Sequence, residues 1–370
     1  MHSSQKFLGG DQLTHVVGGN LDSLVLKTAP IPSPKANEVL VKIKAVSIQF
    51  RDLMILSGSY PIQLPDNLVP GSDMAGEIVS VGEDVKGWSA GDRVSANFFL
   101  DKTHNKETSG EILGSALGGG VHGVLTEYRV FPTHSLVRIP DHLSFEEAST
   151  LPCAAVTAYN ALLDGFEALK AGDTVLIQGT GGVSIFALQF VVASGANAIV
   201  LSSSDEKLKA ATKLGAKHVI NYKTQSNWSE EVLKLTGGVG VDRVIEVVGN
   251  TTLAQSLAST RLEGSIDLIG VLGEDGDVSP VDIVRPAIFK QIKIRGIYVG
   301  SAAQHVLFKN KELVLINLPR FKAMNRLLAA NPETTRPVID KVFEFSEAKE
   351  ALHYMKKQAH VGKIVIRVAA

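Results

Sequence analysis

The pattern of apolar and polar residues changes along the chain. In the first third, the apolar stretches are short and rich in β-branched residues, as in VLVKIKAV (39–46) and EIVSVG (77–82), and this composition is typical of β-strands. From residue 173 onward, short apolar runs alternate with amphipathic segments such as DEKLKAATKLG (205–215). Strands that alternate with helices predict a parallel sheet covered by helices on both faces.

Two other segments complete this outline. Residues 101–123 contain polar clusters and three consecutive glycines, which predicts a long loop. The last segment, 342–368, is expected to form a strand, a helix and a strand that return to the first domain. The sequence therefore predicts an α/β protein whose β-rich domain comprises residues 1–150 with 321–370, and whose doubly wound parallel sheet comprises residues 151–300.

Length, charge and cysteine content narrow the class of protein. The chain has 370 residues, which suggests two domains, and its 37 Lys and Arg residues nearly balance its 38 Asp and Glu residues. No basic run indicates nucleic acid or an anionic membrane, and no apolar stretch approaches the roughly 20 residues that span a bilayer. The only cysteine, Cys153, excludes a disulfide framework. We expect a cytoplasmic protein that acts on a small molecule.

A glycine-rich loop lies in the stretch VLIQGTGGVSIFALQF (175–190). It follows a predicted strand and precedes a predicted helix, as a dinucleotide-binding fingerprint requires. One glycine permits the tight turn, another lets backbone N–H groups approach a pyrophosphate, and the helix N-terminus stabilises its charge. Ser184 takes the place of the third glycine and is small enough to keep helix and strand close. The residues assigned to this loop are Gly179, Gly181, Gly182 and Val183.

The end of the second strand of this domain indicates which nucleotide is bound. An NAD enzyme places an acidic residue there to bind the ribose 2′-OH, whereas this chain has Ser202, Ser203 and Ser204, followed by Lys207. Hydroxyl groups and a lysine can bind a 2′-phosphate, so NADPH is favoured, with Ser203 and Lys207 as its candidate ligands. A capping box formed by Ser203 and Glu206 is the structural alternative.

Three stretches carry a resemblance to a known family. These are AVSIQFRDLMILSGSYP (45–61), VPGSDMAGEIVSVGEDVKGWSAGDRV (69–94) and LPCAAVTAYNALL with the following GDTVLIQGTGGV (151–183). Together they resemble the GroES-like domain and the start of the coenzyme domain of medium-chain dehydrogenases/reductases. The similarity covers nearly the whole chain, and it implies a GroES-like catalytic domain joined to a Rossmann domain.

The resemblance also bears on zinc. The positions that match the catalytic ligands of zinc alcohol dehydrogenases are Gln49, Ser72 and Cys153, and a single thiolate cannot hold an ion that needs about three protein ligands. Residues 101–123 contain no cysteine for a structural zinc site. We therefore expect no metal. The chain is similar to the zinc-free quinone oxidoreductase (zeta-crystallin-like) branch, which implies NADPH-dependent reduction of quinones or α,β-unsaturated carbonyls.

In the first domain, the resemblance suggests three catalytic candidates. Gln49 stands where this branch usually has Asn and could donate a hydrogen bond to the substrate oxygen. Tyr60 matches a tyrosine of the active cleft. The alternative interpretation is that Tyr60 is a half-buried aromatic residue of a loop. Arg51 is the third catalytic candidate. It is expected to form an ion pair with Asp52 at the start of a helix, so its role is either structural or catalytic. Cys153 is interpreted as a small buried hydrophobe rather than a nucleophile.

On the coenzyme side, the resemblance assigns residues at the ends of successive strands. Packing at a strand end is the alternative for the apolar ones. The assigned residues are Thr157 at the nicotinamide end, Tyr222 near the adenosine phosphate, Val248, Val271 and Leu272 after two central strands, Tyr298 with Val299 beside the nicotinamide, and Lys363, which returns from the C-terminal segment to close the cleft.

One stretch departs from the family pattern. Residues 301–320 contain AAQHVLFKNKELVLINLP, which has no counterpart in the resemblance and is either a real insertion or a gene-model artefact. The preceding IKIRGIYVG (292–300) resembles the edge strand through which family members dimerise, which implies a homodimer. The leading hypothesis is a zinc-independent NADPH-dependent reductase of quinones or enones. The alternatives are a metal-free NADP-dependent alcohol or aldehyde dehydrogenase and a non-catalytic NADPH-binding protein.

Overall fold

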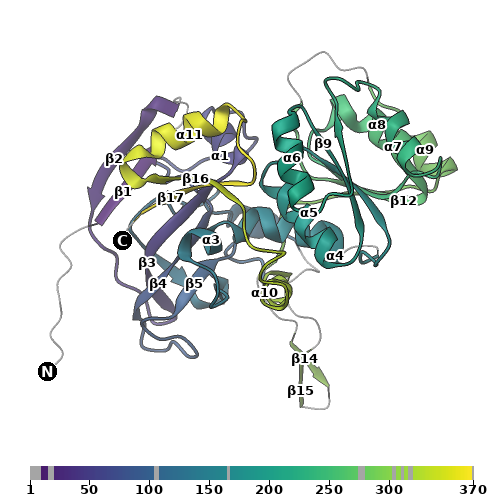
Figure 1. Cartoon of the computed structure of the whole chain (residues 1–370). Helices are drawn as coiled ribbons and strands as arrows, with labels where there is room; N and C mark the ends of the chain where they lie inside the picture. Colours follow the sequence, from purple (N-terminus) through teal and green to yellow (C-terminus); the bar gives the residue numbers. More distant parts are fainter. Residues whose placement is uncertain are drawn as a thin grey trace, which may run out of the picture. The chain divides into compact units, whose positions relative to one another are not determined.

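The computed structural model describes residues 10–15, 21–103, 108–164, 167–273, 280–301, 306–309, 312–315 and 320–368 (Figure 1). The chain divides into two compact units. The first comprises Met1–Cys153, Gly300–Ala330 and Ile339–Ala370, and the second comprises Ala154–Val299 and Asn331–Val338. Within the described residues, no helix has the length and apolar character needed to cross a membrane.

The first unit is built on a seven-stranded sheet. Its strand order is β16-β17-β3-β4-β5-β7, and β6 pairs with the opposite end of β3. The bounds are β3 Glu38–Ile48, β4 Asp73–Val81, β5 Arg93–Ala96, β6 Tyr128–Pro132, β7 Leu136–Arg138, β16 Ile339–Glu344 and β17 Lys363–Arg367. A separate antiparallel pair is formed by β1 (Gly10–His15) and β2 (Leu24–Ala29).

The helices of the first unit are short. They are α1 Phe50–Leu56, α2 Gly110–Gly114, α3 Phe145–Ser149, α10 Arg320–Ala330 and α11 Ala348–Lys356, with single turns at Leu21–Ser23, Thr133–Ser135 and Phe345–Glu347 and a π-helical turn at Leu151–Ala155. Helix α2 lies inside the segment predicted as a loop. Its N-terminus is capped by Ser109, whose hydroxyl accepts a hydrogen bond from the Ile112 N–H at 3.2 Å. The loop prediction for that stretch was therefore wrong in part, because the glycines around it concealed a capping signal.

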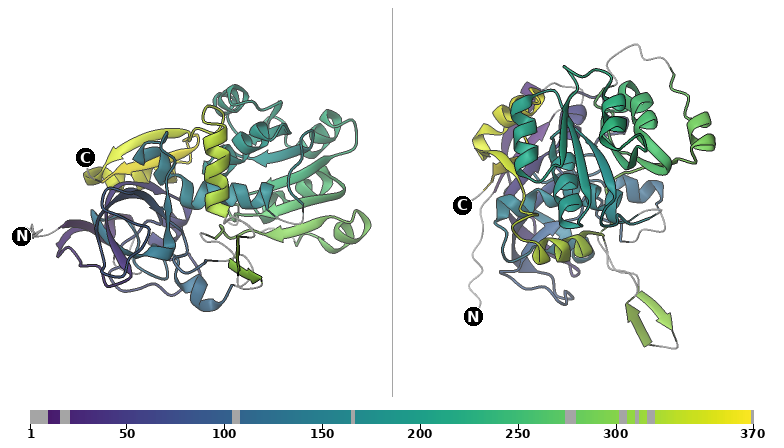
Figure 2. Two further views of the ribbon diagram at one scale, coloured as in Figure 1. Left: turned by 90° about the horizontal axis from the view of Figure 1, so that it is seen from below. Right: turned by 45° about the vertical axis from the view of Figure 1, so that its right-hand side comes forward.

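The C-terminal segment forms the predicted strand, helix and strand. Strand β17 pairs antiparallel with β3, with Ile364 opposite Ile48 and Arg367 opposite Ala45, and β16 pairs parallel with β17. Figure 2 shows these two C-terminal strands lying beside the N-terminal β3. Alternate residues of β3 and β17 enter one apolar core with Phe131 and Met74, so the last part of the chain completes the sheet that the first part begins.

The second unit contains a six-stranded parallel sheet in the order β10-β9-β8-β11-β12-β13, with helices on both faces (Figure 1). The strands are β8 Thr174–Gln178, β9 Asn197–Ser202, β10 His218–Asn221, β11 Val241–Glu246, β12 Thr260–Leu268 and β13 Lys293–Gly296. The helices are α4 Val156–Leu163, α5 Gly182–Ala193, α6 Asp205–Lys213, α7 Trp228–Leu235, α8 Asn250–Ser259 and α9 Val284–Phe289. The predicted doubly wound sheet and the two-part fold class are confirmed.

Of the insertion predicted at 301–320, the structure describes Ser301, two strands and Arg320. Strands β14 (Val306–Lys309) and β15 (Glu312–Leu315) form an antiparallel pair. Residues 302–305, 310–311 and 316–319 lie outside the described residues.

Candidate functional site

The glycine loop of the second unit joins β8 to α5. Gly179 has φ of 73°, a backbone conformation that favours glycine, and Gly181 is the N-cap of α5. No side chain caps this helix, and a Cβ atom added at Gly181 would meet no atom within 4 Å. The first residues of the helix, Gly182 and Val183, therefore begin an open, uncapped N-terminus of a kind that fits a pyrophosphate.

Ser184 links this helix to the preceding strand. Its buried hydroxyl donates a hydrogen bond to the Gln178 carbonyl at 2.7 Å. The serine thus occupies the position where the fingerprint has its third glycine, and it holds α5 close to the end of β8.

The end of β9 carries the serines that were assigned to the coenzyme phosphate. Helix α6 begins at Asp205 and its N-cap is Ser204, whose hydroxyl accepts from the Lys207 N–H at 3.5 Å. The alternative capping box of Ser203 and Glu206 is therefore wrong, because the helix begins one residue later than that pairing requires. Tyr222 lies beside this turn, since its backbone N–H donates to the Ser202 carbonyl at 3.1 Å.

The acidic residues that follow the serines have partners of their own. Asp205 accepts a hydrogen bond from the Asn221 amide at 2.7 Å, and Glu206 pairs with Lys209 at 2.8 Å. Strand β9 itself ends at Ser202 without a carboxylate. The arrangement lacks the acid that would accept from a ribose 2′-OH and would repel a 2′-phosphate.

The remaining coenzyme candidates lie after the carboxyl ends of the central strands or on α4. The structure brings two of these segments together, because the Gly273 N–H donates to the Val248 carbonyl at 2.9 Å. Val271, Leu272 and Tyr298 are exposed, whereas Thr157 and Val299 are buried. Val299 has φ of 55°, and its carbonyl accepts a hydrogen bond from Asn160, one turn after Thr157 on α4. The carboxyl edge of a parallel sheet is where ligands of this fold bind.

A buried carboxylate that sequence reasoning missed organises the same edge. Glu246, the last residue of β11, has no exposed surface and accepts five hydrogen bonds. The donors are Gln178 Nε2 at 2.6 Å, Ser256 Oγ at 2.5 Å, Thr252 Oγ1 at 2.7 Å, and the backbone N–H groups of Val248 and Gly249 at 3.0 Å each. They tie the ends of β8 and β11 to the start of α8. Polar residues at the ends of otherwise apolar strands were the signal in the sequence.

In the first unit, Gln49 stands between β3 and α1. Its backbone N–H donates to Asp52 at 2.7 Å, which closes the first turn of the helix. Its side-chain amide Nε2 donates to Asp73 Oδ2 at 2.6 Å. The main chain and the side chain of Gln49 are thus each fixed by a carboxylate.

Asp73 is the centre of a buried hydrogen-bond cluster. Besides Gln49, it accepts from Ser72 Oγ at 2.7 Å and from the Cys153 backbone N–H at 3.1 Å. Sequence reasoning did not single out Asp73. Lys363 lies nearby and was assigned to the coenzyme cleft. The structure buries this lysine in the first unit, where its Nζ donates to the Ile48 carbonyl at 2.8 Å.

Burial dominates the electrostatics of this cluster. It raises the pKa of Asp73 to about 7, although the Lys363 ammonium opposes the shift. It likewise lowers the pKa of Lys363, and it raises the pKa of Asp52 and of the Cys153 thiol. Cys153, which is partly buried, therefore remains a thiol at neutral pH, in contrast to a nucleophilic cysteine.

Arg51 does not form the expected ion pair with Asp52. Its NH1 donates to the Leu117 carbonyl at 3.0 Å, and its guanidinium carbon lies 4.9 Å from the Tyr60 ring centroid and 4.7 Å from that of Phe98. The carboxylate of Asp52 is engaged by the Gln49 backbone instead. Two buried nitrogens of Arg51, Nε and NH2, have no hydrogen-bond acceptor among the residues that the structure describes.

Gly119 makes room for this guanidinium. A Cβ atom at that position would lie 2.1 Å from Arg51 NH2, so a larger residue would displace the end of the arginine side chain. The absence of a side chain at Gly119 therefore leaves space for Arg51 beside Tyr60.

The donors at the positions of Gln49, Ser72 and Cys153 do not fit a catalytic zinc. Their side chains are an amide and a hydroxyl that both donate to Asp73, and a thiol whose pKa is raised. Zinc sites use deprotonated thiolates, imidazoles and carboxylates. In the described part of the chain, no group of three or more His, Cys, Asp or Glu side chains is placed to hold a metal ion.

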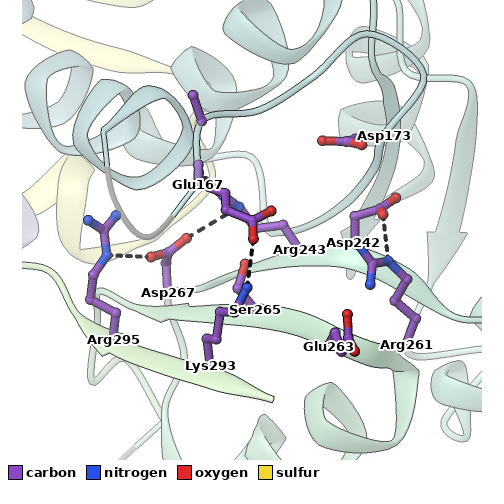
Figure 3. Close-up of a pocket in the computed structure, with 11 residues that line it drawn as sticks. Glu167, Asp173, Asp242, Arg243, Arg261, Glu263, Ser265, Asp267, Lys293 and Arg295 are labelled. Atoms are coloured by element: carbon purple, nitrogen blue, oxygen red, sulfur yellow. Dashed lines mark hydrogen bonds and ion pairs between the residues drawn. The ribbon is translucent and has the colours of Figure 1, made fainter. Parts of the chain in front are cut away.

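A second polar cluster lies in the second unit, toward the amino ends of β8 and β11 (Figure 3). Asp267 pairs with Arg295 at 3.0 Å and with Arg243 at 3.8 Å. Both arginines also donate to carbonyls at the C-terminal end of α4, including that of Ala161. The cavity between these residues is about 30 Å³, which holds roughly one water molecule and no coenzyme or substrate. We interpret this cluster as structural.

Comparison with known families gives two matches. Residues 35–141 match the alcohol dehydrogenase GroES-like domain, and residues 182–313 match the zinc-binding dehydrogenase family. These regions fall in the first and the second half of the chain, on either side of the connection at 153–154.

Three relatives carry the names of three different oxidoreductases. A Schizosaccharomyces pombe zinc-type alcohol dehydrogenase-like protein is 46% identical over 90% of this chain and 91% of its own length. Acryloyl-coenzyme A reductase of Metallosphaera sedula is 33% identical over 95% of this chain and 98% of its own length. Human quinone oxidoreductase is 28% identical over 74% and 75% of the two chains.

Solved structures share the fold over nearly the whole chain. A putative alcohol dehydrogenase of Sinorhizobium meliloti has a TM-score of 0.83 at 36% identity and covers 98% of this chain and 100% of its own. An NAD-dependent alcohol dehydrogenase has a TM-score of 0.81 at 27% identity, with 97% and 100% covered. A mycobacterial protein complexed with NADPH has a TM-score of 0.74 at 25% identity, with 97% and 100% covered.

Proposed function

This chain belongs to the medium-chain dehydrogenase/reductase superfamily and is an oxidoreductase that uses a nicotinamide cofactor, and we propose that it reduces a quinone or an α,β-unsaturated carbonyl compound with NADPH and without a metal ion. The observation that carries the proposal is the donor set of the first unit. The residues at the zinc positions form a hydrogen-bonded cluster around Asp73, which holds a neutral amide, Gln49, at the end of β3.

A neutral amide suits the reduction of a conjugated acceptor. NADPH, when bound, supplies the hydride that forms the new C–H bond at the β-carbon, and the π electrons move to the carbonyl oxygen. Gln49 Nε2 has a second hydrogen besides the one donated to Asp73, and it can donate that hydrogen to the oxygen on which charge develops. A proton then reaches the enolate and completes the addition of two hydrogens. Removal of a hydroxyl proton from a simple alcohol would instead require a base or a Lewis acid.

Arg51 and Tyr60 supply further stabilisation in this proposal. The guanidinium of Arg51 has two buried nitrogens without acceptors, so its charge is available to an oxyanion. Tyr60, which stacks on that guanidinium, provides a phenol that can donate a hydrogen bond or a proton. These interactions favour an enone or a quinone over an unactivated ketone as the substrate, because a conjugated acceptor needs only hydrogen-bond donors at its oxygen.

The preference for NADPH rests on the turn after β9. Ser203 is left uncommitted by the helix cap, Lys207 is in the first turn of α6, and Asp205 and Glu206 are paired elsewhere. A 2′-phosphate would gain hydroxyl and ammonium partners at this turn. We expect a Lys207→Gln variant to lose about tenfold in affinity for NADPH and to keep its affinity for NADH, measured by fluorescence titration of each coenzyme.

We also propose that the protein forms a homodimer through the edge of the parallel sheet. Strand β13 is the last strand of that sheet, and α9 and its neighbours present exposed apolar side chains. Val284, Ile288 and Phe289 are 61%, 63% and 76% exposed. Apolar side chains gathered beside an open strand edge favour association with a second copy. Sedimentation of wild type against Phe289→Glu would test this interface.

The assay that tests the function uses purified protein treated with a chelator. Consumption of NADPH and of NADH is followed with a quinone, an enone and an aldehyde as acceptors. The proposal predicts chelator-resistant turnover of NADPH with the quinone or enone. Activity that disappears with chelation would overturn metal independence. Turnover confined to alcohols and aldehydes would favour the metal-free alcohol dehydrogenase; several relatives are named as alcohol dehydrogenases or as similar to them. Tight NADPH binding without any turnover would indicate a non-catalytic binding protein.

A further inference from the structure

The first unit contains a cavity of about 460 Å³ that none of the candidate catalytic residues lines. It is bounded by the end of β2 with the Pro30–Pro32 turn, by the loop at 66–69, and by the segment from His122 to Val130. A volume of this size accommodates a small organic molecule. The question is what its lining would recognise.

Arg129, on strand β6, is a cation without a matching anion. Its NH1 donates to the Gly123 carbonyl at 2.7 Å, and its guanidinium lies 5.4 Å from the Phe131 ring centroid. Its Nε is buried and has no acceptor, and no carboxylate among the described residues pairs with it. Burial alone lowers the pKa of this guanidinium to about 10, so it remains charged at neutral pH. A largely desolvated charge without a partner is costly, and an anion in the cavity would remove that cost.

Other donors line the same cavity. Lys27 is exposed, and its Nζ makes a long hydrogen bond of 3.5 Å to the Asn67 Oδ1. His122 accepts the Val69 N–H at its Nδ1, 3.2 Å away, so a neutral ring carries its proton on Nε2 and can donate it. Asp66 is the single acidic residue in the lining, and it is exposed. Two permanent cations thus face one peripheral carboxylate.

The remaining wall is mainly apolar, although Asn67, Thr126 and Tyr128 also line it. Its apolar residues are Ala29, Pro30, Ile31, Pro32, Val69 and Val130. We propose that this cavity binds a small organic anion whose oxyanion group, a carboxylate or a phosphate, pairs with Arg129 and Lys27, and whose short apolar body packs against the prolines and valines. The proposal is independent of the reductase activity, because it uses none of the residues assigned to hydride transfer.

The test is calorimetric titration of the full-length protein with hexanoate and, separately, with inorganic phosphate. Wild type is expected to bind hexanoate more tightly than phosphate, because only hexanoate carries the apolar body. Arg129→Met is expected to weaken hexanoate binding at least tenfold, and Lys27→Gln about threefold. Arg138→Gln, which removes an exposed arginine of the same unit that already pairs with Asp92, is the matched control and should bind as wild type does.

Two further measurements distinguish binding in this cavity from binding elsewhere and from loss of folding. Gln49→Ala should retain hexanoate binding, because a loss there would place the probe in the catalytic site and overturn the proposal. If Arg129→Met fails to fold, the exposed Lys27→Gln decides: a threefold loss supports the site, and unchanged binding refutes it. Absence of hexanoate binding to wild type, equal binding by a folded Arg129→Met, or phosphate binding as tight as that of hexanoate would each contradict the assignment.

Discussion

Two buried aspartates, Asp267 in the second unit and Asp73 in the first, illustrate two ways of placing a carboxylate inside this protein. Asp267 lies between two arginines that also bind carbonyls at the end of α4 (Figure 3). Asp73 accepts hydrogen bonds from an amide, a hydroxyl and a backbone N–H, and the charge of Lys363 lowers its pKa.

The charge of the partners determines what each carboxylate can do. Burial raises the pKa of Asp267 too, but two permanently charged guanidinium groups oppose this rise and tie the carboxylate into the packing of α4 against the sheet. The partners of Asp73 are mostly neutral, and burial brings its pKa to about 7, where it can gain or lose a proton under working conditions. The first arrangement is suited to stability, and the second to chemistry.

The largest expected effect is on stability at Asp267. An Asp267→Asn variant leaves two arginines without their carboxylate, and we expect the free energy of unfolding to fall by about 3 kcal/mol. Urea unfolding measures the loss. Asp92→Asn, which breaks the exposed pair with Arg138, is the control and should cost less than about 1 kcal/mol. A loss at Asp267 no larger than that of the control would remove the contrast between the two clusters.

The next effect is on catalysis at Asp73. Asp73→Asn keeps the shape but removes the charge that fixes the Gln49 amide, and we expect kcat/KM for the acceptor to fall about tenfold, or roughly 1.4 kcal/mol. The KM for NADPH should not change. Steady-state kinetics with urea unfolding on the same samples separate the two effects. If Asp73→Asn loses stability as Asp267→Asn does while kcat/KM is preserved, then Asp73 is structural as well.

The pH dependence of stability should also distinguish Asp73. Its pKa in the folded protein, about 7, is above its ordinary value of 3.8, so between these values the folded state holds more protons than the unfolded state. The free energy of unfolding should therefore fall as pH rises from about 4 to 7, by at most roughly 1.4 kcal/mol per pH unit from this group. Unfolding series at several pH values, with Asp73→Asn as the reference, measure the contribution. An identical slope in the variant would assign the dependence to other groups.

The smallest expected effect is a shift in the pH dependence of catalysis when Lys363 is replaced. Lys363 lowers the pKa of Asp73, so Lys363→Met should raise it further and move the pH midpoint of kcat/KM upward by about one pH unit. The pH–rate profiles of wild type and variant provide the test. Lys349→Met, at an exposed lysine that contacts the Asp22 carbonyl, should leave the midpoint in place. A downward movement in Lys363→Met would show that the lysine does not act on Asp73 through its charge.

Sequence reasoning was most successful where the signal is local. The strand and helix periods and the Gly179–Gly181 spacing predicted the parallel sheet and its loop, because each depends on neighbouring residues. Asp73 was missed, and its proximity to Lys363 was not predicted, because the two residues are far apart in the chain. Adjacency in the sequence also led to a wrong prediction. Arg51 and Asp52 are neighbours, but Arg51 binds the Leu117 carbonyl and Asp52 binds the Gln49 N–H. Long-range pairing of polar groups leaves no periodic trace in a sequence.

The pairing of β17 with β3 has a consequence for biosynthesis. Residues Ala45–Ile48 of β3 find their partners at Ile364–Arg367, so a ribosome releases the second strand long after the first. Until then the Ala45–Ile48 part of β3 lacks its β17 partner, and the turn that carries Gln49 lacks the Lys363 contact. The strands of the second unit lie between these segments in the chain, and their sheet needs no residue from the last thirty. The nucleotide-binding half can therefore form first during translation, while the half that holds Gln49 is completed only after the C-terminal segment emerges, and the nascent chain exposes an apolar strand edge that a chaperone would shield.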